Sequence, residues 1–153
     1  MANSGDNSKT AMIEQLNATL ADHFALYIKT KNFHWHLKGP RFRDLHLMFD
    51  EQAAAILAVT DPMAERARKV DASTLTSIGS IAKHARIKDQ DSTKLDADAM
   101  VKELHADNAK VVADLKALKE AAEEAGDNAT SALVDEWQDA AEERVWFLGQ
   151  TMA

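Results

Sequence analysis

The chain contains no cysteine, which excludes disulfide bonds, thiolate metal sites, iron–sulfur clusters and a cysteine nucleophile. Any bound metal ion must therefore use histidine and carboxylate ligands. Glycine and proline are also scarce, at five and two among 153 residues, which disfavours sandwiches, barrels and disordered chains. No apolar run approaches the ~20 residues of a membrane span, and the first ten residues lack the pattern of a signal peptide. We therefore expect a cytoplasmic protein with no membrane partner.

Basic residues are in the minority, with 18 Lys and Arg against 25 Asp and Glu and a formal net charge of −7. This balance repels nucleic acid unless positive charge is concentrated in one place. Hydrophobic residues make up 46% of the chain, which is enough for one sizeable core. We predict a single domain over residues 10–153, preceded by a flexible tail over residues 1–9 that lacks apolar periodicity.

Apolar residues recur at three- and four-residue steps, the period of an amphipathic helix, in four long stretches. These stretches cover residues 10 to about 36, 42 to about 70, 95 to about 122 and 128 to about 149. Pro62 lies inside the second stretch and predicts a kink over residues 58–62 or a break just before it. We also predict a short helix within residues 74–85 and a left-handed helix end at Gly126.

The links between the first two helices and between the last two are short, whereas the link in the middle is long. This all-α pattern predicts two antiparallel hairpins joined by a crossover, as in ferritin-like four-helix bundles. An ordinary up-down-up-down bundle fits the same periodicity, and helix count alone does not separate the two.

Polar residues on the second helix form a stripe of metal-ligating types. Four of them project from one face at about 100° of rotation per residue: His46, Asp50, Asp61 and Glu65. Asp50 and Asp61 are eleven residues apart, about 16 Å of helix, too far for both to bind one ion. One chain therefore holds two half-sites. A solvent-exposed polar face with pairs four residues apart is the alternative explanation.

Two copies of the chain, paired antiparallel along this face, would complete both half-sites. The His46/Asp50 end of one helix would meet the Asp61/Glu65 end of the other, giving two identical sites around a two-fold axis. His34 is placed to join the first half. Two imidazoles and three carboxylates suit Fe(II), with Mn(II), Co(II) and Zn(II) as competitors. No histidine has a glutamate three residues before it, so an intrachain di-iron centre is not expected.

The stretch KNFHWHLKGPRFRDLHLMFDEQ over residues 31–52, continued by DPMAER over residues 61–66, closely resembles the signature of the Dps family. These mini-ferritins are also called DNA-binding proteins from starved cells. Intervals of eleven, three, ten and three residues separate the five ligand candidates and match the family's intersubunit ferroxidase centre at every position. The resemblance implies a ferritin-like bundle with a short helix in the crossover. It also implies that one subunit supplies His34, His46 and Asp50, and its two-fold mate Asp61 and Glu65.

By this resemblance the chain is a ferroxidase that oxidises Fe(II), with hydrogen peroxide in preference to dioxygen. It would store ferric iron in a hollow dodecamer and protect DNA and the cell from oxidative damage. Trp35 matches a tryptophan thought to intercept radicals beside the site, although a packing role at a dimer interface is the alternative. His36 stands where the family commonly has Asn, as an extra weak ligand or a surface histidine. Carboxylates near the start of the last helix would line an iron-entry pore: Asp127, Asp135 and Asp139.

DNA binding is the family activity for which the sequence offers the least support. Family members that condense DNA typically use Lys- and Arg-rich tails, whereas residues 1–10 hold only Lys9, offset by Asp6. Twelve chains at −7 each would repel phosphate, so we expect weak or absent DNA binding at physiological salt. The one basic cluster lies over residues 83–88. A nucleoid-associated protein that binds and shields DNA, with little ferroxidase activity, is the alternative function.

Overall fold

The computed structural model describes residues 4–153, and this part of the chain forms six helices and no strand. The helices are α1 (Ser4–His36), α2 (Phe42–Ala58), α3 (Thr60–Lys69), α4 (Ile78–His84), α5 (Ala97–Glu124) and α6 (Asn128–Met152). The predicted all-α class is confirmed. Within the same residues, none of the helices combines the length and the apolarity needed to cross a membrane.

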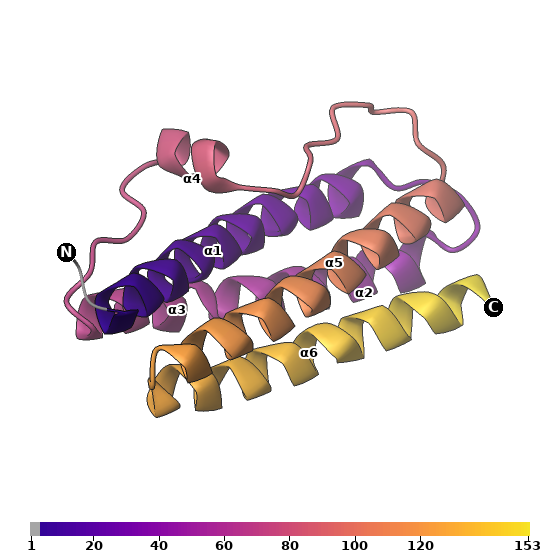
Figure 1. The fold of residues 1–153 in the computed structure, drawn as a ribbon. Helices are drawn as coiled ribbons and strands as arrows, with labels where there is room; N and C mark the ends of the chain where they lie inside the picture. Colours follow the sequence, from indigo (N-terminus) through magenta and orange to yellow (C-terminus); the bar gives the residue numbers. More distant parts are fainter. Residues whose placement is uncertain (1–3) are drawn as a thin grey trace.

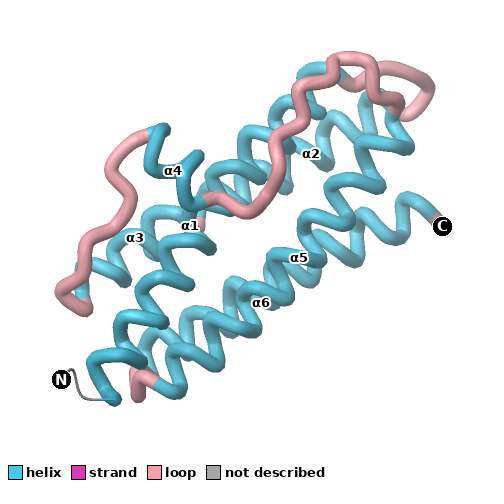
Figure 2. Tube along the Cα trace, turned by 45° about the horizontal axis from the view of Figure 1, so that its top comes forward, coloured by secondary structure: helices cyan, strands magenta, loops and turns pink. Residues whose placement is uncertain are grey.

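The helices form a bundle of two antiparallel hairpins (Figure 1). The first hairpin pairs α1 with α2 and α3, and the second pairs α5 with α6. The connection between them returns along the length of α1 and carries α4, as both views show (Figures 1 and 2). Because of this return, α2 and α5 run in the same direction, whereas an up-down-up-down bundle would make them antiparallel. The ferritin-like crossover topology is therefore confirmed.

The apolar stripes predicted from periodicity meet along the bundle axis. Completely or almost completely buried members come from all four long segments: Leu16, Phe33, Phe49, Ile56, Leu104, Leu115, Leu118, Val134 and Leu148. Each such side chain contributes roughly 1.5–3 kcal/mol by leaving water. This core fixes the faces on which the polar site residues lie.

Pro62 explains the interruption between α2 and α3. Proline has no N–H group, so the carbonyl of Ala58, four residues earlier, lacks its helical partner. α2 ends at Ala58, and α3 begins at Thr60 after Val59. The Thr60 hydroxyl donates to the Leu57 carbonyl at 2.7 Å, which helps to satisfy the end of α2. The predicted break just before the proline is confirmed.

The first helix begins earlier than its apolar pattern suggests. The predicted start at residue 10 is corrected to Ser4. Residues 5, 7, 9 and 10 are exposed, so these turns add helical hydrogen bonds without adding to the core. Extending an existing helix costs far less than starting one, which is why polar residues continue it. Residues 1–3 lie outside the described residues, and the flexibility of the tail stays a prediction.

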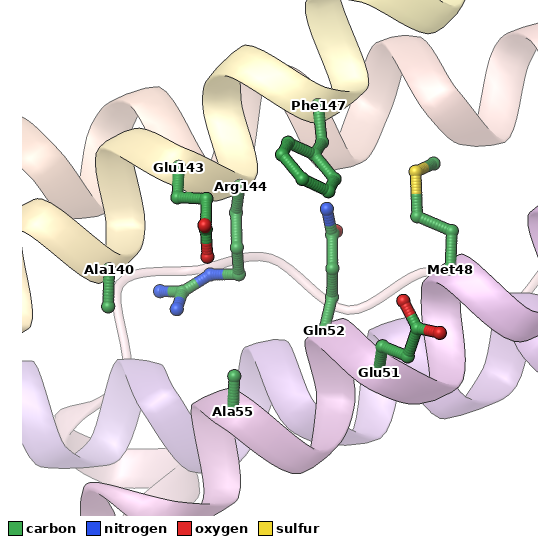
Figure 3. A pocket seen from close by; sticks show the side chains of 8 residues that line it. All are labelled: Met48, Glu51, Gln52, Ala55, Ala140, Glu143, Arg144 and Phe147. Atoms are coloured by element: carbon green, nitrogen blue, oxygen red, sulfur yellow. The ribbon is translucent and has the colours of Figure 1, made fainter.

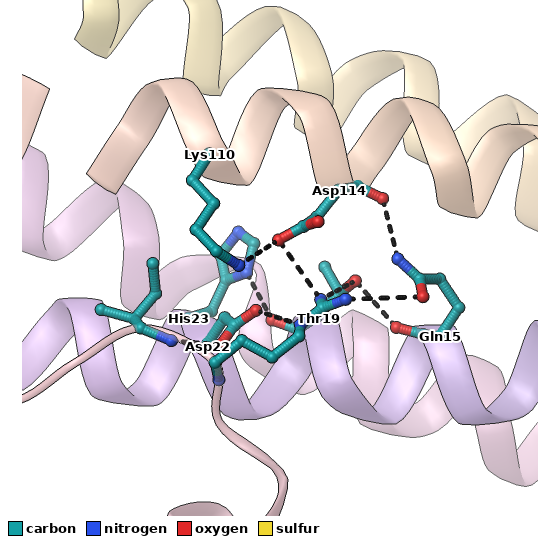
Figure 4. A network of polar contacts seen from close by, with 8 residues as sticks. Gln15, Thr19, Asp22, His23, Lys110 and Asp114 are labelled. Carbon is teal, nitrogen blue, oxygen red and sulfur yellow. Dashed lines mark hydrogen bonds and ion pairs between the residues drawn. The ribbon is translucent and has the colours of Figure 1, made fainter. Parts of the chain in front are cut away.

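The crossover is fastened to α1 by a buried carboxylate. Asp22 is 1% exposed and accepts hydrogen bonds from the backbone N–H groups of Arg86 and Ile87 and from Arg86 Nε at 2.9 Å. Arg86 also lies 3.6 Å from Asp114 of α5. Figure 4 shows Asp22 and Asp114 within this network of polar contacts between α1 and α5. Charged hydrogen bonds of this kind are among the stronger polar contacts in proteins. They hold the long connection against the bundle.

Candidate metal centre

Two histidines bind each other's backbone across the α1–α2 hairpin. The Nδ1 atom of His34 lies 2.7 Å from the carbonyl oxygen of His46, and Nδ1 of His46 lies 2.8 Å from the carbonyl oxygen of His34. Their rings stack with centroids 3.8 Å apart, and the Phe42 ring also stacks with His46, at 4.8 Å. This reciprocal pairing holds both imidazoles in fixed orientations.

The hydrogen bonds also determine which nitrogen is available. A carbonyl oxygen only accepts, so Nδ1 must carry the proton in both rings. In the neutral imidazole the lone pair then lies on Nε2, the atom that faces away from the backbone. Metal-binding histidines are commonly oriented by a hydrogen bond of this type from their other nitrogen. The pair is therefore prepared for a divalent metal ion without a change of tautomer.

Asp50 completes the first half-site. Its carboxylate Oδ1 lies 3.9 Å from Nε2 of His34 and 2.8 Å from Nζ of Lys31. The hydrogen bond from Lys31 is the main reason why the pKa of Asp50 lies below its usual value. The carboxylate is thus ionised and ion-paired. Lys31 was missed in the sequence, although it lies one helical turn before His34 and so on the same face.

The second half-site, Asp61 and Glu65, lies one turn apart on α3. Both side chains are exposed, and neither forms a side-chain hydrogen bond or ion pair with another described residue. Across residues 4–153, no group of three or more histidine and carboxylate side chains is placed to hold a metal ion. Among the predicted ligands, the structure pairs His34 with His46 and places Asp50 beside His34, short of a complete metal site, and it leaves Asp61 and Glu65 apart from them.

Trp35 and His36 follow His34 at the end of α1. Trp35 is 61% exposed, and its ring centroid lies 5.9 Å from Nζ of Lys31. His36 is exposed and its Nδ1 lies within hydrogen-bond distance of both the backbone and the side-chain oxygen of Asn32. This geometry is that of a histidine at a helix end.

The pore candidates have different environments. Asp127 is the N-cap of α6: it accepts from the N–H and the hydroxyl of Thr130 and lies 3.4 Å from Arg66. Asp135 is paired with Lys119 at 2.8 Å, and Asp139 is exposed. The Asp127 carboxylate is occupied by capping α6. Of the three pore candidates, only Asp135 and Asp139 are therefore exposed to solvent. Their role in a pore stays a prediction.

Ion pairs within the protein reduce the free positive charge of the basic cluster over residues 83–88. Arg86 is engaged with Asp22 and Asp114, whereas Lys83 and Lys88 are exposed. Two exposed lysines provide little phosphate attraction against a net charge of −7.

Comparison with known proteins agrees with this architecture. Residues 13–153 match the model of the ferritin-like domain. The structure superposes on Dps from Thermosynechococcus elongatus with a TM-score of 0.95 and 28% identity, covering 99% of this chain and 96% of that one. A Dps protein from Vibrio cholerae, described as a ferritin-like diiron-carboxylate protein, superposes with a TM-score of 0.89 and 26% identity over 96% and 92% of the two chains. The class is thus that of ferritin-like bundles.

The sequence relatives narrow the class. The DNA protection during starvation protein of Brevibacillus brevis is 32% identical over 133 residues, which cover 87% of this chain and 89% of that protein. DNA protection during starvation protein 1 of Deinococcus radiodurans is 31% identical over 139 residues, or 91% and 67% of the two chains. The chain therefore belongs to the Dps family of ferritin-like proteins.

Proposed function

We propose that this protein oxidises Fe(II) at sites shared by two subunits and stores the ferric product. His34, His46 and Asp50 of one subunit would bind the iron together with Asp61 and Glu65 of its two-fold mate. Iron storage and DNA protection are the functions associated with the family in general. The intersubunit ferroxidase centre is the finer step that we propose for this chain.

The observation that carries this proposal is the reciprocal hydrogen bonding of His34 and His46. It fixes two Nε2 lone pairs, and that of His34 lies 3.9 Å from the Asp50 carboxylate. Among residues 4–153 of one chain, these groups lack further carboxylates to complete a metal site, and Asp61 and Glu65 lack side-chain partners. A two-fold pairing satisfies both requirements together, since each surface supplies what the other needs. A ligand set of nitrogen and oxygen atoms without thiolate suits Fe(II) in the presence of an oxidant.

We propose hydrogen peroxide as the preferred oxidant. Two Fe(II) ions each give up one electron, and one peroxide takes both electrons and two protons to form two water molecules. A paired reaction of this kind consumes peroxide without releasing a radical. Trp35, exposed beside the site, is suited to donate one electron to an oxidising radical that escapes. Zn(II), Mn(II) and Co(II) would compete for the same ligands.

The proposed assembly is a hollow dodecamer in the cytoplasm that holds the ferric mineral. Protection of DNA would follow from the removal of iron and peroxide rather than from coating of the DNA. The negative net charge and the few exposed cations favour this route over direct shielding. Retardation of DNA in a gel at physiological salt, without added divalent cations, would favour the DNA-shielding function over the ferroxidase function.

The test adds Fe(II) anaerobically to the purified protein and then supplies peroxide or air in parallel. Ferric absorbance gives the rate, and the mass of the iron-bearing particle shows whether the product stays inside a cage. We expect fast oxidation by peroxide and a soluble iron core. Glu65→Gln should slow the oxidation, whereas Glu120→Gln, an exposed glutamate on α5, should not. Equal rates in both variants, or iron precipitating outside the protein, would refute the site.

A further inference from the structure

A hollow of about 100 Å³ opens between α2 and α6, and none of the proposed iron ligands lines it (Figure 3). Its walls are largely apolar and come from both helices: Met48, Ala55, Ala140 and Phe147. One water needs only ~10–15 Å³ of such space, so the hollow has room for a small polyatomic ligand. Apolar walls strengthen any electrostatic interaction inside it because they exclude solvent.

Arg144 of α6 brings a buried positive charge to this hollow. The residue is 3% exposed, and its Nε donates to Oδ1 of Asn108 at 2.7 Å. Its Nη2 is buried without a hydrogen-bond partner, and the guanidinium forms no ion pair with any carboxylate of residues 4–153. Burial lowers the pKa of Arg144 to about 10, so the group still carries its charge at neutral pH. Buried charges in proteins are normally paired, and this one is not.

Gln52 of α2 faces the same hollow with both of its polar atoms unused. It is 6% exposed, and neither Nε2 nor Oε1 has a hydrogen-bond partner. Figure 3 shows its amide pointing from α2 across to Phe147. The amide offers one donor and one acceptor beside the Arg144 donor.

The surrounding core does not supply the missing negative charge. His23 of α1 is fully buried, and burial together with the charge of Arg144 lowers its pKa to about 4, so it is neutral. Asn108 of α5 is neutral and its side-chain amide nitrogen donates to the Leu104 carbonyl. The polar centre of the bundle therefore consists of neutral groups around one cation. Glu143, which also lines the hollow, attracts Arg144 electrostatically but forms no ion pair with it. The guanidinium therefore has no direct counter-ion among residues 4–153.

We propose that this hollow binds a small oxoanion with one negative charge and at least one hydroxyl group, the class that includes hydrogencarbonate and dihydrogenphosphate. Its oxygens would accept hydrogen bonds from Nη2 of Arg144 and Nε2 of Gln52, and its hydroxyl would donate to Oε1 of Gln52. Two exposed glutamates, Glu51 and Glu143, stand at the mouth. Their charges disfavour anions of higher charge, which is why a singly charged ligand fits best.

The test measures thermal unfolding of the metal-free protein as sodium hydrogencarbonate or sodium phosphate is added, with sodium chloride at matched ionic strength. A ligand of the folded state raises Tm in a saturable manner. We expect such a rise for wild type with at least one of the two oxoanions and none with chloride. If Tm rises in a saturable manner with only one of the two oxoanions, that oxoanion is identified as the ligand.

Two variants locate the effect. Arg144→Met should abolish the rise, and Gln52→Leu should weaken the apparent affinity at least tenfold. Arg43→Met, an exposed arginine on α2, should behave as wild type. If Arg144→Met does not fold, Gln52→Leu takes its place. Binding is then also followed by NMR, as broadening of the ¹³C line of labelled hydrogencarbonate or of the ³¹P line of phosphate. No saturable rise in wild type, or the same rise in Gln52→Leu, would mean a hollow filled by water and would overturn the proposal.

Discussion

Mixed assemblies of two inactive variants test whether the iron site is shared between subunits. Asp50→Asn damages the half-site on α1 and α2, and Asp61→Asn damages the half-site on α3. If each site takes one half from each subunit, every site in either variant alone contains one damaged half. Both variants should therefore oxidise Fe(II) slowly while assembling normally.

The magnitude follows from the two-fold pairing of halves. When the two variants are present in equal amounts and pair at random, about half of the dimers contain one of each. Such a dimer has one site with both damaged halves and one site with neither. About a quarter of all sites are thus intact, and the mixture should recover about a quarter of the wild-type rate.

The assay uses co-expressed chains with two different tags, purified in tandem, and stopped-flow ferric absorbance after addition of peroxide. A control pair places both substitutions in the same half, Asp50→Asn with His46→Asn, for which no pairing restores a site. Recovery in the first pair and none in the control is expected. A mixture no faster than its parents would refute the shared site and require all ligands of one ion to come from one chain.

Three further predictions concern single residues. Lys31→Met removes the cation paired with Asp50, so affinity for Co(II) should rise a few-fold in a spectroscopic titration. Asp127→Ala should lower the free energy of unfolding in urea by about 1–2 kcal/mol, and Asp127→Asn by less, because asparagine also caps helices. The pKa of His23 is lowered to about 4, whereas an unfolded histidine titrates near ~6.5. The unfolded state binds more protons between these values, so stability falls by roughly 3 kcal/mol as pH drops from 6.5 to 4, and His23→Gln should show a smaller fall in thermal unfolding.

The fold was largely predictable because it depends on repeated local signals. Apolar spacing located the four long helical segments, Pro62 located the break at Val59, and Gly126 located the end of α5, where its φ is +71°. The start of α1 at Ser4 was not predictable in this way, since its first turns are polar and carry no periodicity. Helix extension there follows from the backbone rather than from side-chain pattern.

The site was predictable only in its residue types. Spacing placed His46 and Asp50 on one face, but the reciprocal bonds between His34 and His46 depend on how the α1–α2 turn sets the two helices. The pairing of Lys31 with Asp50 joins residues nineteen positions apart and appears only when the hairpin is closed. Arg144 and Gln52 were invisible for the same reason, because burial of a polar residue is decided by packing between helices and not by sequence.

The interruption at Val59 places the two halves of the proposed ligand set on separate helices. The ladder of helical hydrogen bonds is interrupted between His46 and Asp50 on α2 and Asp61 and Glu65 on α3, because Pro62 has no N–H group to donate to the Ala58 carbonyl. A substitution near Pro62 is thus able to re-aim Asp61 and Glu65 by a few degrees while His46 and Asp50 stay in place. In the proposed assembly, metal preference would be adjustable through this one joint per subunit, without repacking of the bundle core.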